Sequence, residues 1–91
     1  MVYSLDLPAD LANAGWKVKI RDRERLEPPH VTILFKARAW RLNLRTGQFL
    51  DEGESWRGVD PGVRTAIEDA WPRLCAAWDS MYPQNPVGDR E

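Results

Sequence analysis

The stretch that decides the fold is residues 30–45, HVTILFKARAWRLNLR. Its first half is rich in β-branched and aromatic residues, and in its second half apolar and polar residues alternate, which is typical of half-buried strands. Residues 30–36 and 39–45 therefore predict an antiparallel hairpin with Ala37 and Arg38 at its tip. The opposed pairs are then Phe35–Trp40, Ile33–Leu42 and Val31–Leu44, all on one apolar face.

The sequence on either side of this hairpin extends the sheet. In residues 16–21, Trp16, Val18 and Ile20 alternate with basic residues, and this pattern predicts a strand. After the hairpin, Thr46 and Gly47 favour a turn that leads into a short strand at residues 48–50, with Phe49 opposite Leu44. The sequence thus predicts a meander of three or four strands.

A short helix is expected near the N-terminus, over residues 7–14. Pro8 suits its first position, and Gly15 suits the left-handed residue that ends it.

A longer helix is expected to start at Asp60, as N-cap, and Pro61. Apolar residues then recur every three or four positions, which predicts one helix face packed on the sheet: Val63, Ile67, Trp71, Leu74, Trp78 and Met81. Pro72 removes a backbone donor and predicts a kink or break near residues 69–71.

The fold expected from these elements is α+β: an antiparallel three- to four-stranded β-meander covered on one face by a long, kinked C-terminal helix, with a short N-terminal helix. A chain of 91 residues makes one domain, which we place at residues 1–83 and follow with a polar tail at 84–91. Five tryptophans supply much of the core volume, and Trp40 and Trp71 are expected inside it.

Composition excludes several classes of protein. No apolar run approaches the ~20 residues that span a bilayer, and no secretory leader is evident, so neither a membrane partner nor export is expected. Cys75 is the single cysteine and has no partner for a disulfide in the chain, which fits a cytoplasmic protein.

Charge is distributed unevenly along the chain. Residues 15–45 hold nine Lys and Arg against three acidic residues, a balance of +6, whereas residues 46–91 have a balance of −5. Alternation places many of the basic residues on the sheet face opposite the apolar one. The candidate binding residues are Lys17, Lys19, Arg21, Lys36, Arg41 and Arg45. Such a face either binds an acidic protein or nucleic acid, or only keeps an exposed sheet soluble.

His30 is the single histidine and the only candidate acid or base of this type. Glu27 and Asp51 are its nearest candidate partners, and parity places it opposite Arg45 on the polar face. No glycine-rich phosphate loop, nucleophile elbow or zinc-protease motif is present. The cluster of Asp51, Glu52 and Glu54 lacks the spacing of a calcium loop, so neither a metal nor a cofactor is expected.

The segment Glu27-Pro28-Pro29-His30-Val31, followed by a basic hairpin and a tryptophan-bearing helix, resembles small bacterial families that share a Pro-Pro-His motif before a strand. Those families have no assigned chemistry, and some members of a larger relative are encoded beside antitoxin-like genes. The resemblance implies a companion protein as partner. The relative has a second histidine two residues after the first, where this chain has Thr32.

Two functions follow from this sequence. The first is a non-catalytic binding module that uses its basic face to contact an acidic protein partner, such as an antitoxin-like companion, or nucleic acid. The alternative is a small toxin-like ribonuclease with His30 as acid or base and Arg41 or Arg45 holding the phosphate.

Overall fold

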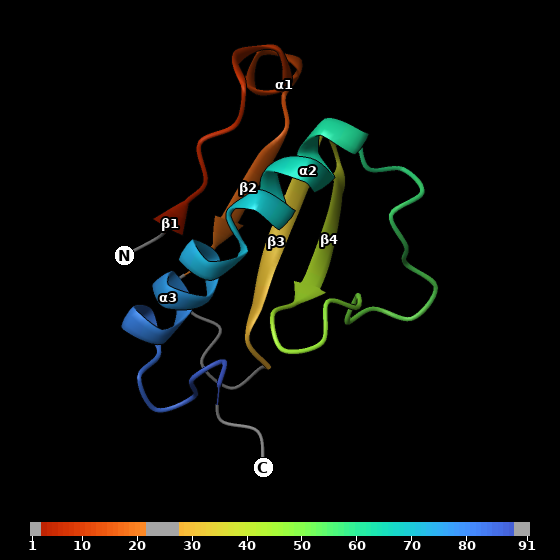
Figure 1. The fold of residues 1–91 in the computed structure, drawn as a ribbon. Helices are drawn as coiled ribbons and strands as arrows, with labels where there is room; N and C mark the ends of the chain where they lie inside the picture. Colours follow the sequence, from red (N-terminus) through yellow and green to blue (C-terminus); the bar gives the residue numbers. More distant parts are fainter. Residues whose placement is uncertain (1–2, 22–27, 89–91) are drawn as a thin grey trace.

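The alternating stretch from residue 30 forms the centre of the sheet in the computed structural model, which describes residues 3–21 and 28–88. Within these residues four strands pair antiparallel in chain order: β1 (Tyr3–Ser4), β2 (Lys17–Ile20), β3 (His30–Phe35) and β4 (Arg38–Asn43). The same residues form three helices: α1 (Ala9–Ala14), α2 (Pro61–Asp69) and α3 (Trp71–Met81). The expected α+β class and meander are confirmed (Figure 1).

The β3–β4 hairpin has a different register from the expected one. Ile33 pairs with Trp40 and Val31 with Leu42, a shift of two residues from the predicted pairs. The tip therefore lies at Lys36 and Ala37, and Lys36 adopts a left-handed φ of 55°. Because strand side chains alternate with a period of two, an even shift keeps every apolar residue on the same face. The alternation of apolar and polar residues is therefore compatible with both registers and does not distinguish them.

Strand β1 comes from the N-terminus, where no strand was predicted. Tyr3 pairs with Ile20 and Ser4 with Lys19.

The strand expected at residues 48–50 is reduced to one bridge. Phe49 lies opposite Leu42 and not opposite Leu44 as predicted. Two backbone hydrogen bonds of 2.8 Å flank the bridge, from Asn43 N to Gln48 O and from Leu50 N to Arg41 O. This segment therefore covers only the C-terminal half of the β4 edge, at residues 41–43.

Helix α1 begins and ends close to the expected residues. Pro8 precedes the helix as its cap rather than serving as its first residue. Gly15 ends it with φ 108°, a conformation that costs glycine little because it has no Cβ. The chain then reverses into β2.

The C-terminal helices are capped and broken where the sequence predicted. The Asp60 carboxylate accepts a 2.7 Å hydrogen bond from the Gly62 N–H, and Pro61 opens α2. The helical path breaks at Ala70, whose φ of −99° and ψ of 8° separate α2 from α3. Pro72 then falls in the first turn of α3, where a missing N–H is tolerated.

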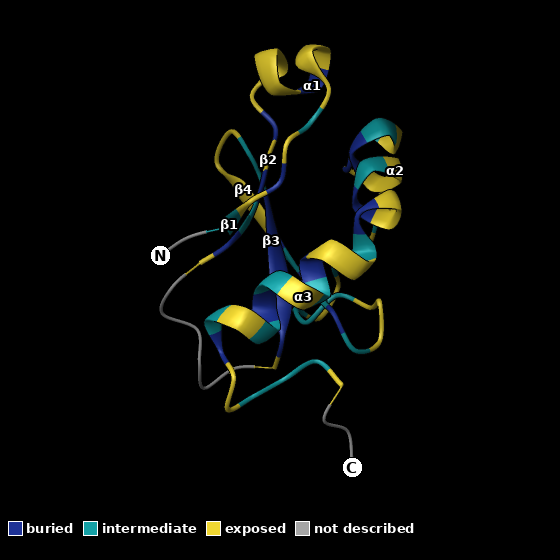
Figure 2. Ribbon diagram, turned by 60° about the vertical axis from the view of Figure 1, so that its left-hand side comes forward, coloured by how far each residue is buried: buried dark blue, intermediate teal, exposed yellow. Residues whose placement is uncertain are grey.

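Both helices lie on one face of the sheet and turn their buried sides toward it (Figure 2). The buried helix positions are Val63, Ile67, Ala70, Leu74 and Trp78. The expectation that Trp71 lies in the core is wrong, because Ala70 takes the inward position at the break and Trp71 is only partly buried. Trp40 is buried as predicted, at 1% exposure.

The C-terminal segment folds back onto α3. The Trp78 Nε1–H donates to the Asn85 carbonyl at 2.7 Å, and the Val87 N–H donates to Asp79 Oδ1 at 2.7 Å. Residues 84–88, which the sequence assigned to a polar tail, are thus docked, while residues 89–91 lie outside the described part.

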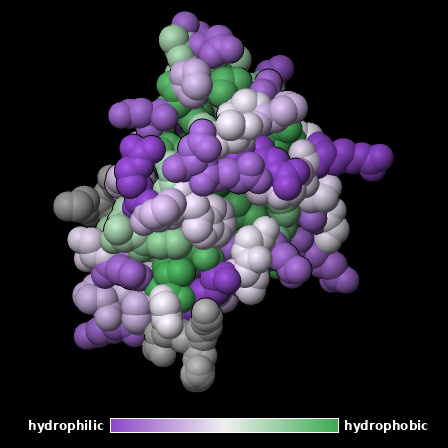
Figure 3. All heavy atoms as spheres, viewed as in Figure 1, coloured by the Kyte–Doolittle hydropathy of each residue, from purple (hydrophilic) through white to green (hydrophobic). Residues whose placement is uncertain are grey.

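Hydrophilic residues spread over the face that carries the helices, with smaller hydrophobic areas between them (Figure 3). Across the described residues, no helix combines the length and the apolar character needed to cross a membrane.

Candidate binding surface on the sheet

The face of the sheet turned away from α2 and α3 carries the predicted cationic residues of β2 and β4. We call it the open face. By register its positions are Ser4, Lys17, Lys19, His30, Thr32, Leu34, Ala39, Arg41 and Asn43. Two of them, His30 and Thr32, are buried. Leu34 is half-buried and Ala39 exposed, so this face also has apolar positions beside its cations.

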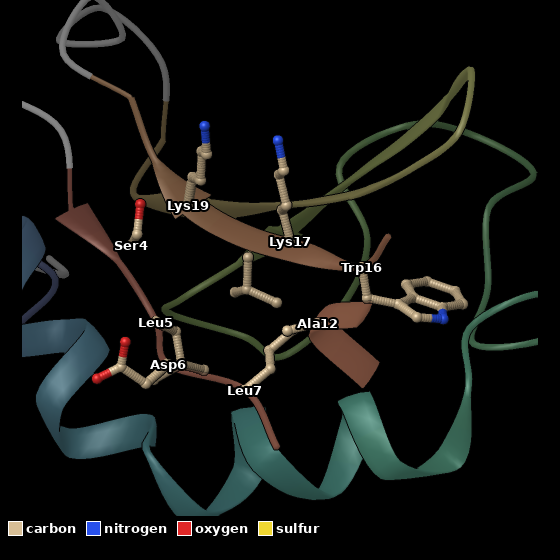
Figure 4. A pocket seen from close by; sticks show the side chains of 9 residues that line it. Ser4, Leu5, Asp6, Leu7, Ala12, Trp16, Lys17 and Lys19 are labelled. Carbon is tan, nitrogen blue, oxygen red and sulfur yellow. The ribbon is translucent and has the colours of Figure 1, made fainter. Parts of the chain in front are cut away.

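Lys17 and Lys19 are brought together as predicted. They are two residues apart on β2, so their side chains point to the same side of the sheet. Figure 4 shows both ammonium groups on the side of β2 away from the helices. Lys17 is exposed and Lys19 half-buried.

Arg21 and Lys36 lie at the margins of this surface. Arg21 follows the last residue of β2 and is exposed, and its carbonyl accepts a hydrogen bond from the Tyr82 hydroxyl. Lys36 lies at the hairpin tip, where its Nζ is 5.1 Å from the centre of the Phe35 ring. Phe35 in turn stacks on Trp16.

Arg41 is neutralised by a partner that alternation did not reveal. Its Nη2 lies 2.6 Å from Asp51 Oδ1 and its Nε 3.1 Å from Asp51 Oδ2, a two-point ion pair. The hydrogen bond from Arg41 lowers the pKa of Asp51 below its ordinary 3.8, against a smaller opposing effect of desolvation. His30 adds a weaker electrostatic lowering.

Arg45 is engaged within the chain as well. Its guanidinium donates to the carbonyl oxygens of Pro86 at 2.7 Å and Val87 at 3.2 Å, and to Asn85 Oδ1 at 3.1 Å. Arg45 thus fixes the C-terminal segment instead of facing a partner. Among the predicted binding residues, Lys17 and Lys19 form the part of the surface directed toward solvent on the open face.

A cavity of about 340 Å³ opens beside these two lysines, between residues 4–7 and β2. We call it the lysine groove. Apolar side chains make up much of its lining, which comprises Leu5, Leu7, Ala12, Trp16, Lys17, Val18 and Lys19. The ammonium groups of Lys17 and Lys19 point away from Leu5 and Leu7, to the opposite side of β2 (Figure 4). Ser4 and Asp6 also line it, and the Asp6 carboxylate points away from both ammonium groups (Figure 4).

The groove exists because β1 and β2 separate. They pair at Ser4–Lys19, and the last backbone bond between them runs from Leu5 N to Val18 O at 2.9 Å. The chain then turns into α1. Sequence reasoning missed the groove, although the alternation of Leu5, Asp6 and Leu7 before Pro8 is a strand-like signal that was present.

His30 lies opposite Asn43, not opposite Arg45 as expected, because of the two-residue register shift. Its ring is 0% exposed, packs against Trp78 at 5.6 Å between ring centres, and donates from Nδ1 to the Pro28 carbonyl at 2.9 Å. Glu27, one expected partner, lies outside the described residues. A general acid or base must reach the proton it transfers, and this ring has no surface open to a substrate.

The aromatic residues of the chain all belong to the core or pack against it. The Trp16 ring stacks on the Phe35 ring, with 4.1 Å between ring centres, and its centre lies 5.9 Å from that of Trp40. The Phe49 and Trp56 rings meet edge to face, with 5.0 Å between their centres. No aromatic residue occupies a register position of the open face along the paired strands that the structure describes.

The other candidate groups are dispersed. Burial, with a smaller contribution from Asp79, raises the pKa of the half-buried Cys75 thiol. In the described ranges, no three His, Cys, Asp or Glu residues lie close enough together to hold a metal ion.

No protein-family model, curated protein or solved structure matches this chain. The resemblance to the Pro-Pro-His families therefore stays a prediction.

Proposed function

We propose that this chain is a non-catalytic binding module that docks an acidic, leucine-bearing segment of a partner protein in the lysine groove. The observation that carries the proposal is the combination of an apolar lining with Lys17 and Lys19 at its side. An apolar side chain of the partner fills the groove, and neighbouring carboxylates reach around the edge of β2 to meet the two ammonium groups.

Three features favour an acidic protein over nucleic acid. Single-stranded nucleic acids are commonly held by bases stacked on aromatic side chains, and the aromatic residues here pack in or against the core. Arg41 and Arg45 are occupied by Asp51 and by the C-terminal segment. Within residues 3–21 and 28–88, few cations remain on the open face. A protein interface can use these few, because it combines apolar contacts with a polar rim.

The ribonuclease alternative is not supported by an observation of this kind. It requires His30 to reach a phosphodiester, and His30 is fully buried beneath Trp78 and Pro28.

The test uses a fluorescent peptide in which Glu alternates with Leu, and fluorescence anisotropy as the readout. We expect saturable binding that weakens as salt rises, because salt screens the pairing of carboxylates with ammonium groups. The double variant Lys17→Glu/Lys19→Glu should lose binding. Its matched control, Arg64→Glu/Arg73→Glu, makes the same change of charge on the exposed sides of α2 and α3 and should bind like the parent.

A second variant tests the contribution of the apolar lining separately from that of the two lysines. Ala12 lines the groove and is exposed, so Ala12→Phe should fill it and weaken binding with both lysines in place. Ala14→Phe, on the same helix but outside the lining, is the control. Equal binding by the parent and the lysine double variant would contradict the proposal, and tighter binding of a polyuridine of equal charge would assign the surface to nucleic acid instead.

A further inference from the structure

A second cavity lies beside the N-terminal half of β4, along the part of the strand edge that residues 48–50 do not cover. Its volume is about 290 Å³, near the lower end for ligand pockets. It lies between Arg38 and Trp40 of β4 and the loop of residues 53–58, which runs from the sheet toward α2 (Figure 1). None of its residues belongs to the lysine groove.

The charged residues of this cavity leave it with an excess positive charge. The Arg38 guanidinium lies 4.4 Å above the Trp40 ring, and its Nη2 is 3.2 Å from Glu54 Oε1. Arg57 also lines the cavity, is exposed, and forms no ion pair with any residue of the described ranges. One carboxylate therefore balances one of two guanidinium groups.

The neutral groups of the cavity are donors. The Nε1–H of Trp40 is buried and has no acceptor among the residues that the structure describes, although a buried N–H without an acceptor is costly. The Ser55 Oγ accepts the backbone N–H of Arg57 at 3.3 Å, so its hydroxyl proton remains available to donate.

The backbone of the loop approaches Arg38 closely at Gly58. A Cβ at this position would lie 3.0 Å from Arg38 Nη1 and 3.4 Å from Trp40 Cζ2. A larger residue would push against the stacked guanidinium, so glycine keeps the cavity open beside Trp40.

From this arrangement we infer that the cavity binds the phosphate group of a small phosphomonoester. The terminal oxygens of a phosphate accept hydrogen bonds, and Arg57 and Ser55 offer donors of two kinds around one space that the Trp40 ring lines. The excess positive charge disfavours a cation. Arg38 is held by stacking on Trp40 and pairing with Glu54, so it adds a fixed positive charge to the site. The inference is independent of the proposed function, since it uses other residues.

The test is a titration followed by ¹H–¹⁵N NMR at constant ionic strength, with inorganic phosphate and glycerol 3-phosphate as the two probes. The Trp40 indole N–H signal, assigned with Trp40→Phe, and the backbone amide signals of Ser55 and Gly58 should shift and saturate. Arg57→Ala should weaken binding about tenfold or more, because it removes a charge-assisted hydrogen bond. Arg73→Ala, which removes an exposed arginine of α3, should leave the affinity unchanged.

Gly58→Ala is the second variant and should weaken binding while the spectrum outside the loop stays like that of the parent. Tighter binding of glycerol 3-phosphate than of inorganic phosphate supports the ester as ligand, and the reverse order assigns the site to the free anion. Shifts that never saturate with either probe, or equal affinity in Arg57→Ala, would overturn the inference.

Discussion

Arg45 and Asn85 are joined by a hydrogen bond of 3.1 Å from guanidinium Nη2 to amide Oδ1, although forty residues separate them in the chain. The same guanidinium also donates to the carbonyls of Pro86 and Val87. One side chain after β4 therefore contacts three consecutive residues of the C-terminal segment, 85–87, which Trp78 and Asp79 also contact.

Arg45→Ala should release this segment. Hydrogen bonds from a charged donor contribute roughly 1.5–3 kcal/mol when buried, and Arg45 is half-buried, so we expect a loss of about 1–2 kcal/mol in the free energy of unfolding. Amide hydrogen exchange of Val87 should accelerate, because its bond to Asp79 depends on the docked segment. Arg73→Ala is the control, and unchanged exchange in Arg45→Ala would show that Arg45 does not hold the segment.

Trp40→Ala and Trp71→Ala should differ in their effect on stability. Trp40 is 1% exposed between Trp16 and Arg38, and its truncation should cost about 3–5 kcal/mol. Trp71 is only partly buried, so its truncation should cost clearly less. Urea denaturation of both variants checks the order, and equal losses would contradict the placement of Ala70 as the inward residue.

Asp51 should make stability depend on pH in the acid range. Its pKa is lowered in the folded protein, so its ion pair with Arg41 contributes fully above the ordinary value of 3.8 and is lost as pH falls through the lower folded-state value. Asp51→Asn should therefore be less stable than the parent at neutral pH, and the difference should shrink toward zero in acid. Urea denaturation at several pH values measures this, with the exposed Glu52→Gln as control. A difference that does not change with pH would argue against the ion pair as its source.

Thr32→Val should stabilise the protein. Thr32 is 2% exposed, and its Oγ1 is buried without a hydrogen-bond partner in the part of the chain that the structure describes. Removing a buried, unpaired hydroxyl recovers its desolvation cost, which we expect to raise the free energy of unfolding by about 1 kcal/mol or more. Thr65→Val, at an exposed site of α2, should change little. A loss of stability in Thr32→Val would show that the hydroxyl is satisfied.

The features of the fold that were predictable from sequence are those that depend on local chemistry. Asp60 and Pro61 predicted the start of α2, and Gly15 predicted the end of α1. Pro72 predicted the break between α2 and α3. The hairpin register was not predictable, because a two-residue shift leaves the apolar face intact and Lys36 accepts the left-handed conformation at the tip. Strand β1 is only two residues long, and its one sequence signal is the alternation that continues through Leu5, Asp6 and Leu7.

The candidate surface was predictable only in part. Alternation correctly placed Lys17 and Lys19 on one side of β2. It said nothing of Asp51 or of the C-terminal segment, which approach Arg41 and Arg45 from loops. The partners of a cation depend on how distant loops pack, and a strand pattern carries no such information.

The order of strands in the sheet follows the order of the chain. Each strand pairs with its neighbour in sequence, so no crossover must form before the next contact. Chains dominated by contacts between nearby residues pay less loop-closure entropy and fold faster than those with distant pairings. The β3–β4 hairpin can form before the helices arrive, and α2 and α3 then need only close over a sheet that already exists.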